Sequence, residues 1–145
     1  MRLSIKESDE HKDIEIIIHC PKIDDRLSQL IELIQQHDIH LIGKNQKRIQ
    51  SIPVKDLLYI ESVDNNSFLY TLTNEFESNL KLYEIEKIVK NTRFIRISKN
   101  LIVNISQIQS VRALFNGRFE ALLVNGEKVI VNRHYVKSFK EKFLN

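Results

Sequence analysis

The chain has 145 residues, 42% hydrophobic and 28% charged, which is typical of one globular domain with room for a small appendage. No apolar run approaches the roughly 18 residues that a membrane-spanning helix needs, so we expect no membrane insertion. The polar, mixed-charge stretch 1–12 does not resemble a secretory signal. Cys20 is the single cysteine, which excludes an internal disulfide framework and favours a reducing cytoplasm as the location.

The net charge of +3 hides a gradient along the chain. Residues 1–45 contain 6 Lys/Arg and 9 Asp/Glu (net −3), residues 46–90 contain 6 and 7 (net −1), and residues 91–145 contain 10 and 3 (net +7). A basic carboxyl-terminal third is the electrostatic pattern of a polyanion-binding protein. An ordinary solvated basic surface gives the same pattern, so charge alone leaves both interpretations open.

Residues 1–45 predict a small β-α-β extension. The run 14–20 is rich in isoleucine and ends at a proline, which is typical of a strand. Asp24 or Asp25 can cap a helix. The apolar residues of that helix recur at i, i+3, i+4 and i+7, namely Leu27, Leu30, Ile31 and Ile34. A short strand is expected at 39–42. The unit is small for an independent fold, so we expect it to pack on the rest of the chain or to contribute to dimerisation.

From residue 46 onward the pattern is mostly β. The expected strands lie near residues 48–53, 57–62, 68–73 and 94–97, with a short helix across 81–90. Residues 101–103 fit either a continuing strand or one helical turn. Two Asn-Gly pairs, at 116–117 and 125–126, predict type I′ turns that join three strands into a meander. Asn132 is expected to cap a terminal helix whose apolar side carries Tyr135, Val136, Phe139 and Phe143.

Catalytic and metal-binding patterns are weak in this sequence. The three glycines are isolated, which excludes a phosphate-binding loop and a dinucleotide fingerprint. Cys20 has His19 as its sequence neighbour, which is unusual for a catalytic dyad. His37 and His40 have a spacing that metal sites use, but a helix end and a strand start explain them as well. We therefore expect no enzyme activity, no metal and no cofactor.

Three segments in the last two thirds of the chain follow a known pattern in order and spacing. The run Leu57-Leu58-Tyr59-Ile60-Glu61 comes first. The run 94–104, Phe-Ile-Arg-Ile-Ser-Lys-Asn-Leu-Ile-Val-Asn, is close to Phe-x-Arg-Ile-His-Arg-Ser-x-Ile-Val-Asn. Asn116-Gly117 and the run 131–137 come last, the latter close to Val-Ser-Arg-Arg-Tyr. In these features residues 46–145 resemble the LytTR DNA-binding domain. With the extension at 1–45, the chain is similar to short bacterial LytTR regulators that lack a receiver domain.

The resemblance implies a mostly β (α+β) fold, antiparallel, with short helices at its edges. It also implies a transcription regulator that binds double-stranded promoter DNA by inserting loops into successive grooves, usually as a homodimer on direct repeats. An upstream signalling protein is a possible further partner. The alternative from another class is a protein-interaction adaptor that kept the fold and lost most DNA affinity.

Carried over from the resemblance, three loops supply the DNA contacts. The segment Asn65, Asn66 and Ser67, with Asp64 before it, would contact bases, although it also fits an ordinary hairpin turn. Ser98, Lys99 and Asn100 form the second loop, where the family usually has His-Arg-Ser. Lys99 keeps the positive charge without the planar fork of arginine, so we expect it to bind phosphate and to read guanine less sharply.

The third loop is Asn132, Arg133 and His134, where the family usually has Ser-Arg-Arg. Arg133 matches, whereas His134 replaces a permanent cation with a side chain that is largely neutral at pH 7. Asn132 fits a helix cap as well as a DNA contact. The expected phosphate contacts, which also fit ordinary exposed charges, are Arg96, Lys137 and Lys140.

Overall fold

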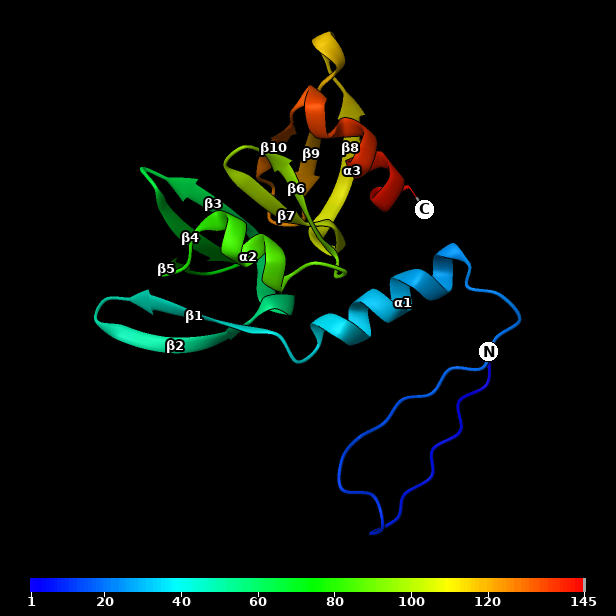
Figure 1. Cartoon of the computed structure of the whole chain (residues 1–145). Coiled ribbons are helices and arrows are strands. Elements are labelled where there is room, and N and C mark those ends of the chain that lie inside the picture. Colours follow the sequence, from blue (N-terminus) through cyan, green and yellow to red (C-terminus); the bar gives the residue numbers. More distant parts are fainter. Residues whose placement is uncertain (145) are drawn as a thin grey trace.

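The computed structural model describes residues 1–144 (Figure 1), and its secondary structure is mostly antiparallel β with short helices, as expected. Its helices are α1 (Asp25–Gln36), α2 (Leu82–Ile88) and α3 (Val136–Phe143). Its strands are β1 (His40–Asn45), β2 (Arg48–Pro53), β3 (Leu57–Val63), β4 (Asn66–Thr71), β5 (Glu75–Ser78), β6 (Phe94–Ser98), β7 (Leu101–Asn104), β8 (Ile108–Ala113), β9 (Phe119–Leu123) and β10 (Lys128–Val131). Four single 3-10 turns are η1 (Val54–Asp56), η2 (Ile105–Gln107), η3 (Phe115–Gly117) and η4 (Arg133–Tyr135).

The strands form two antiparallel sheets. The larger has seven strands in the order β2-β1-β5-β4-β3-β7-β6, and the smaller is the expected meander, β10-β9-β8. Strand β3 is central and buried over Leu57–Ile60, because its two faces are both covered. Residues 101–103 belong to β7, which pairs with both β3 and β6.

Two hydrophobic cores lie on the two faces of the larger sheet. Strand β3 contributes to both cores, since Ile60 enters the first and Tyr59 the second. The first core packs α2, through Leu82 and Ile85, against the sheet. The second core packs the opposite face against the smaller sheet and α3, whose Phe139 is fully buried. The sheet is therefore held rigidly between two layers, and its connecting loops emerge at its ends.

The amino-terminal region differs from the expected β-α-β unit. Residues 14–20 form no strand and are exposed. The expected strand at 39–42 is β1, which already has a partner on each edge, β2 and β5. A strand is stable only when it is paired, and β1 has no free edge for the run 14–20. The β1–β2 hairpin also crosses the expected domain boundary between residues 45 and 46.

Helix α1 begins as predicted. The side chain of Asp24 accepts a hydrogen bond from the backbone N–H of Leu27 at 2.8 Å, which caps the helix. The helix is anchored at its other end, where Gln36 is its buried residue. Its apolar stripe is half-buried, and Leu30 and Leu33 stay exposed. Ile16 and Ile18 of the preceding segment line a small pocket together with the same helix.

An ion-pair cluster also fastens α1 to the rest of the fold. The Glu32 carboxylate lies 3.7 Å from Arg93 and 3.4 Å from Lys142 of α3. Burial lowers the pKa of the Lys142 ammonium, and the Glu32 carboxylate partly offsets that effect. The helix is thus joined both to the start of β6 and to the carboxyl-terminal helix.

The turns correct the sequence prediction in detail. Asn116 and Gly117 both have positive φ, 68° and 74°, but the β8–β9 ladder ends at Ala113 and Phe119, so the loop is longer than a type I′ turn. At 125–126 only Gly126 has positive φ, so that turn is not type I′ either. Asn132 occupies the cap position of η4, but its side chain makes no capping hydrogen bond.

Candidate nucleic-acid interface

The first two predicted loops lie together at one end of the larger sheet. Strands β3 and β7 are antiparallel with Glu61 opposite Leu101, so the β3–β4 turn and the β6–β7 turn emerge at the same end. A backbone hydrogen bond joins them directly, from the N–H of Ser62 to the carbonyl of Asn100 at 2.8 Å.

The third predicted segment lies beside the second. The backbone N–H of Asn132 donates to the carbonyl of Ile97 at 2.9 Å, which holds η4 against the end of β6. Figure 1 shows the β3–β4 turn, the β6–β7 turn, η4 and the β8–β9 loop following one another along one edge of the molecule. We call these four segments the loop edge.

The β3–β4 turn presents amide side chains. Asp64 and Asn65 both have positive φ, 50° and 67°, and Val63 pairs with Asn66, so this is a two-residue hairpin turn. The ammonium of Lys81 donates to the carbonyl of Asn65 at 2.8 Å, which ties the turn to α2. Asn65 and Asn66 are exposed. Ser67 is only 1% exposed, so its side chain faces the interior and is not presented to a ligand.

Arg96 holds the β6–β7 turn in shape. Its Nε donates to the carbonyl of Ser98 at 2.9 Å, and a terminal nitrogen donates to the carbonyl of Lys99. Its other terminal nitrogen lies 3.1 Å from the Glu86 carboxylate of α2. The guanidinium is therefore engaged within the protein by hydrogen bonds to two loop carbonyls and to Glu86. Because Lys81 and Glu86 both belong to the α2 region, this helix braces the first two loops together.

The side chains at the tip of the second turn are exposed. The hydroxyl of Ser98 accepts a hydrogen bond from the backbone N–H of Asn100 at 3.2 Å. The backbones of Lys99 and Asn100 are hydrogen-bonded within the protein, whereas their side chains are exposed and have no protein partner among the described residues, so both side chains remain available. The turn thus combines a fixed backbone with a free ammonium and a free amide.

Segment η4 supplies a second group of exposed cations. A Cβ built on Gly117 would lie 3.2 Å from Cδ of Arg133, so the stem of this arginine rests on the β8–β9 loop. The His134 ring packs edge-on to Tyr135 at 5.1 Å between centroids. Lys137 is exposed on α3, and Lys140 lies 4.9 Å from the centre of the Phe119 ring.

The charge of the loop edge is largely uncompensated. No ion pair within residues 1–144 occupies the side chains of Lys99, Arg133 or Lys137. The loop edge also carries one negative charge, the exposed carboxylate of Asp64 at the tip of the β3–β4 turn. A row of unpaired cations next to exposed amides suits a polyanion whose edge carries hydrogen-bonding groups.

The β8–β9 loop is a part of this edge that the sequence did not single out. Its Asn-Gly pair predicted a turn and no binding role. In the structure Phe115 and Arg118, on either side of that pair, are exposed next to η4. The available signal was a large aromatic residue beside a turn-forming pair, where polar residues are usual.

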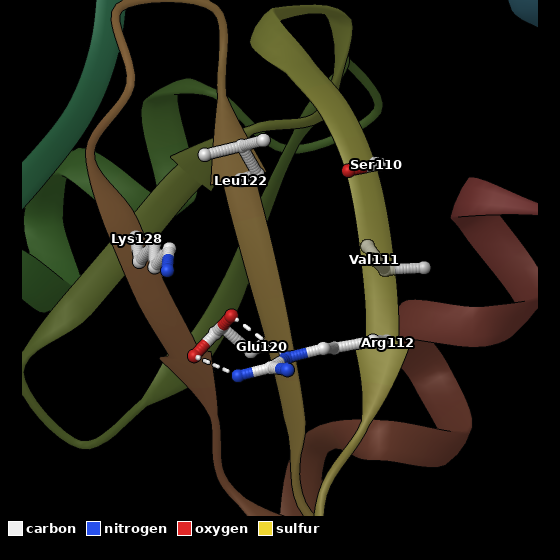
Figure 2. A pocket seen from close by; sticks show the side chains of 6 residues that line it. All are labelled: Ser110, Val111, Arg112, Glu120, Leu122 and Lys128. Carbon is white, nitrogen blue, oxygen red and sulfur yellow. Dashed lines mark hydrogen bonds and ion pairs between the residues drawn. The ribbon is translucent and has the colours of Figure 1, made fainter.

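The remaining surface of the described residues has fewer free polar groups that could bind a ligand. Figure 2 shows a shallow pocket of about 240 Å³ on the outer face of the smaller sheet, whose main polar groups, Arg112 and Glu120, pair with each other at 3.0 Å. Within residues 1–144 no three His, Cys, Asp or Glu side chains are grouped as a metal ion requires. None of the helices in this part of the chain has both the length and the apolar character needed to cross a membrane.

Known proteins are similar to this chain in sequence or in fold. The family model of the LytTr DNA-binding domain matches residues 47–144. An uncharacterized HTH-type transcriptional regulator of Staphylococcus aureus strain MSSA476 is 31% identical over 144 residues, which cover 98% of this chain and 97% of that protein. The relative from strain MRSA252 has the same identity and coverage. A LytTr DNA-binding domain from Bacillus cereus has the same fold, with a TM-score of 0.68 and 22% identity over 71% of this chain and 94% of that one.

The names of the Staphylococcus relatives specify a helix-turn-helix type. In the described part of this chain, five strands separate α1 from α2 and five more separate α2 from α3, so no two helices form such a pair. The family match extends instead across the strands and the turns of the loop edge. The chain therefore belongs to the LytTR DNA-binding domain family.

Proposed function

We propose that this protein is a sequence-specific transcription regulator that places the loop edge against double-stranded promoter DNA and inserts its turns into the grooves. The observation that carries the proposal is that Lys99 and Arg133, both exposed and in no ion pair within residues 1–144, lie on the loop edge, which also carries exposed amides. Lys137 is likewise exposed and unpaired on α3, which follows η4 directly. Such a protein would act in the cytoplasm, where a bacterium keeps its chromosome.

The exposed groups divide into two chemical roles. Lys99 and Lys137 are point charges that suit phosphate oxygens, which fix the position of a protein on the duplex. Arg133 has the planar fork that binds guanine with two hydrogen bonds, and its stem is held in place by the β8–β9 loop. Asn65, Asn66 and Asn100 carry amides that match the hydrogen-bonding edge of adenine. Asp64 would repel phosphate, so the first turn suits base edges better than the backbone.

Two of the residues expected from the sequence take other roles in this proposal. Arg96 acts by shaping the β6–β7 turn, since its guanidinium already binds two loop carbonyls and Glu86. Ser67 acts in packing the start of β4, because its side chain is buried.

The size of the loop edge favours binding to paired sites. Neighbouring strands of one sheet lie about 4.8 Å apart, so the turns that end β3, β7 and β6 together span about 10 Å, and η4 and the β8–β9 loop extend the loop edge beyond them. An edge of this kind covers only a few base pairs, which rise ~3.4 Å each. A site so short recurs too often among the ~10⁶ competing positions of a bacterial genome. Two copies of the chain on two adjacent repeats would supply the missing specificity.

Selection of duplexes from a random-sequence library by the full chain tests the proposal. We expect enrichment of a short motif in two copies, confirmed by gel shift of the selected duplex and of the region upstream of the protein's own gene. A variant with Lys99→Ala, Arg133→Ala and Lys137→Ala should lose retention while its circular dichroism spectrum stays unchanged.

A matched control removes the same charges elsewhere. Lys44, Lys47 and Arg48 are exposed on the β1–β2 hairpin, and their joint replacement by alanine should leave DNA retention nearly intact. Failure of the wild-type chain to enrich any motif or to retard any duplex would contradict the proposal and favour the protein-interaction adaptor.

A further inference from the structure

The β8–β9 loop, residues 114–118, carries an aromatic side chain, Phe115, that is exposed to solvent. Phe115 is 87% exposed, the largest exposed fraction among the large hydrophobic residues described from residue 24 onward. The loop that carries it protrudes beyond its two strands at the top of Figure 1. Isolated exposed apolar residues are common on protein surfaces, so exposure alone indicates no function for Phe115. Its position on the loop edge is what suggests one.

The loop has a fixed shape. The backbone N–H of Leu114 donates to the carbonyl of Arg118 at 2.7 Å, which closes the loop at its base. Asn116 and Gly117 hold the left-handed conformation that reverses the chain. Phe115 is therefore presented by a preformed turn, and binding through it requires little further ordering of the backbone.

The loop is continuous with the proposed DNA-binding surface. Gly117 lies against the side chain of Arg133, with 3.2 Å between its ideal Cβ position and Cδ of the arginine. Any side chain at position 117 would push on Arg133, so the two segments form one unit. Residues 113–119 and 132–137 contain arginine, lysine and histidine but no acidic residue, so the surroundings of Phe115 attract a polyanion.

We propose that Phe115 is a further DNA-contacting residue, which packs its ring against the bases at the outer end of the site that the loop edge reads. This inference rests on the proposed function. Apolar side chains that protrude from DNA-binding surfaces insert between base steps, partly unstack them and kink the duplex. The site would therefore be flanked by an easily unstacked pyrimidine–purine step, which Phe115 selects through DNA flexibility rather than through hydrogen bonds.

The test uses the full chain and the duplex selected by it from a random library. Base–aromatic stacking of ~1–3 kcal/mol corresponds to a loss of affinity of about 5-fold to 150-fold for Phe115→Ala. Phe115→Leu, which keeps an apolar wedge, should recover part of the loss. With 2-aminopurine at each flanking step in turn, wild type should raise the fluorescence at one step, and Phe115→Ala should abolish that rise.

Leu72 provides the control. It is 64% exposed in the β4–β5 turn, at the opposite end of the sheet from the β3–β4 turn, so Leu72→Ala should change neither affinity nor fluorescence.

The possible outcomes separate this inference from the proposed function. If wild type and Phe115→Ala bind the selected duplex equally and give the same fluorescence, Phe115 has no DNA contact although the proposed function stands. If wild type selects no duplex at all, both the proposed function and this inference are wrong. If Phe115→Ala instead changes only the sedimentation of the free protein, the ring serves contact between copies and the inference is overturned.

Discussion

The backbone N–H of Arg93 donates a hydrogen bond at 3.1 Å to the side-chain oxygen of Gln36, which precedes it by 57 residues. Both residues are buried, and Arg93 lies immediately before β6, the strand that leads into the β6–β7 turn. The amide of α1 thus completes the hydrogen bonding of the DNA-binding fold from outside the segment that the family model matches. Helix α1 is thus fastened to the rest of the fold by a buried hydrogen bond.

Replacing Gln36 should therefore destabilise the whole fold. Gln36→Leu leaves the Arg93 N–H buried without an acceptor, which costs about 1–3 kcal/mol of unfolding free energy. Urea unfolding of the full chain measures this loss. The neighbouring Gln35 is exposed on the same helix, so Gln35→Leu is a matched control that should change stability by less than about 0.5 kcal/mol. Equal stability of the two variants would show that α1 is not built into the fold in this way.

Arg96 should prove to be a positioning residue for the β6–β7 turn. Arg96→Lys keeps the charge but cannot bind the carbonyls of Ser98 and Lys99 and the Glu86 carboxylate together. We expect faster hydrogen exchange at the amides of Ser62 and Asn100 and weaker binding to every duplex.

Hydrogen exchange separates this role from a direct phosphate contact. If Arg96→Lys weakens DNA binding while loop exchange stays at the wild-type rate, the guanidinium contacts DNA itself. Glu86→Gln keeps a hydrogen-bond acceptor for Arg96, so it should cause only a small part of the faster exchange and weaker DNA binding expected of Arg96→Lys.

Lys99 and Arg133 should differ in what they contribute to recognition. Lys99→Ala should weaken binding to the selected duplex and to random duplexes by similar factors, because a phosphate contact carries no sequence information. Arg133→Ala should also relax the preference at one base pair, by about 1–3 kcal/mol for a bidentate contact with guanine. Equal losses on selected and random duplexes for both variants would remove the base-reading role from Arg133.

Patterns that depend on local sequence predicted the structure well. The helical spacing of apolar residues and the Asp24 cap located α1, and the apolar run 94–97 located β6. These signals work because capping and amphipathic spacing act within a few residues. The same reasoning placed the loop residues on turns, since polar residues interrupting apolar strands mark the ends of strands.

Features that depend on tertiary partners were not predictable. The isoleucine-rich run 14–20 has strand propensity but forms no strand, and the neighbouring strand β1 is already paired on both of its edges. Ser67 and Arg96 look like surface residues in a one-dimensional pattern, yet the sheet buries one and the β6–β7 turn engages the other. The proximity of Phe115 to Arg133 arises only because Gly117 packs against η4.

Salt should weaken binding in proportion to the phosphate contacts. Each neutralised phosphate lowers the logarithm of the binding constant by about 0.9 per tenfold rise in salt concentration. Lys137→Ala should therefore reduce the slope by about 0.9, whereas Asn100→Ala, which removes no charge, should lower affinity without changing the slope. Titrations at several salt concentrations measure both, and a flat response of wild type would count against direct DNA binding.

Tyr59 gives the fold a dependence on alkaline pH. Its hydroxyl donates to the Glu127 carboxylate at 2.8 Å, and its ring stacks on Tyr70 with 4.4 Å between centroids. Burial, followed by the Glu127 carboxylate, raises the pKa of the Tyr59 hydroxyl. Burial also raises the pKa of Tyr70, with Glu61 as the next cause.

The sign of the effect follows from proton binding. Above about pH 10 the unfolded chain loses tyrosine protons that the folded chain retains, so unfolding becomes more favourable as pH rises. Tyr59→Phe should cost about 1 kcal/mol at pH 7, because a hydrogen bond is lost. Its unfolding free energy should then fall less than that of wild type between about pH 9 and about pH 11. Urea unfolding at both pH values tests this. The lowered pKa of Lys142 affects wild type and Tyr59→Phe equally, so any difference between their pH dependences comes from Tyr59. An equal fall in the unfolding free energy of wild type and Tyr59→Phe over this pH range would contradict the prediction.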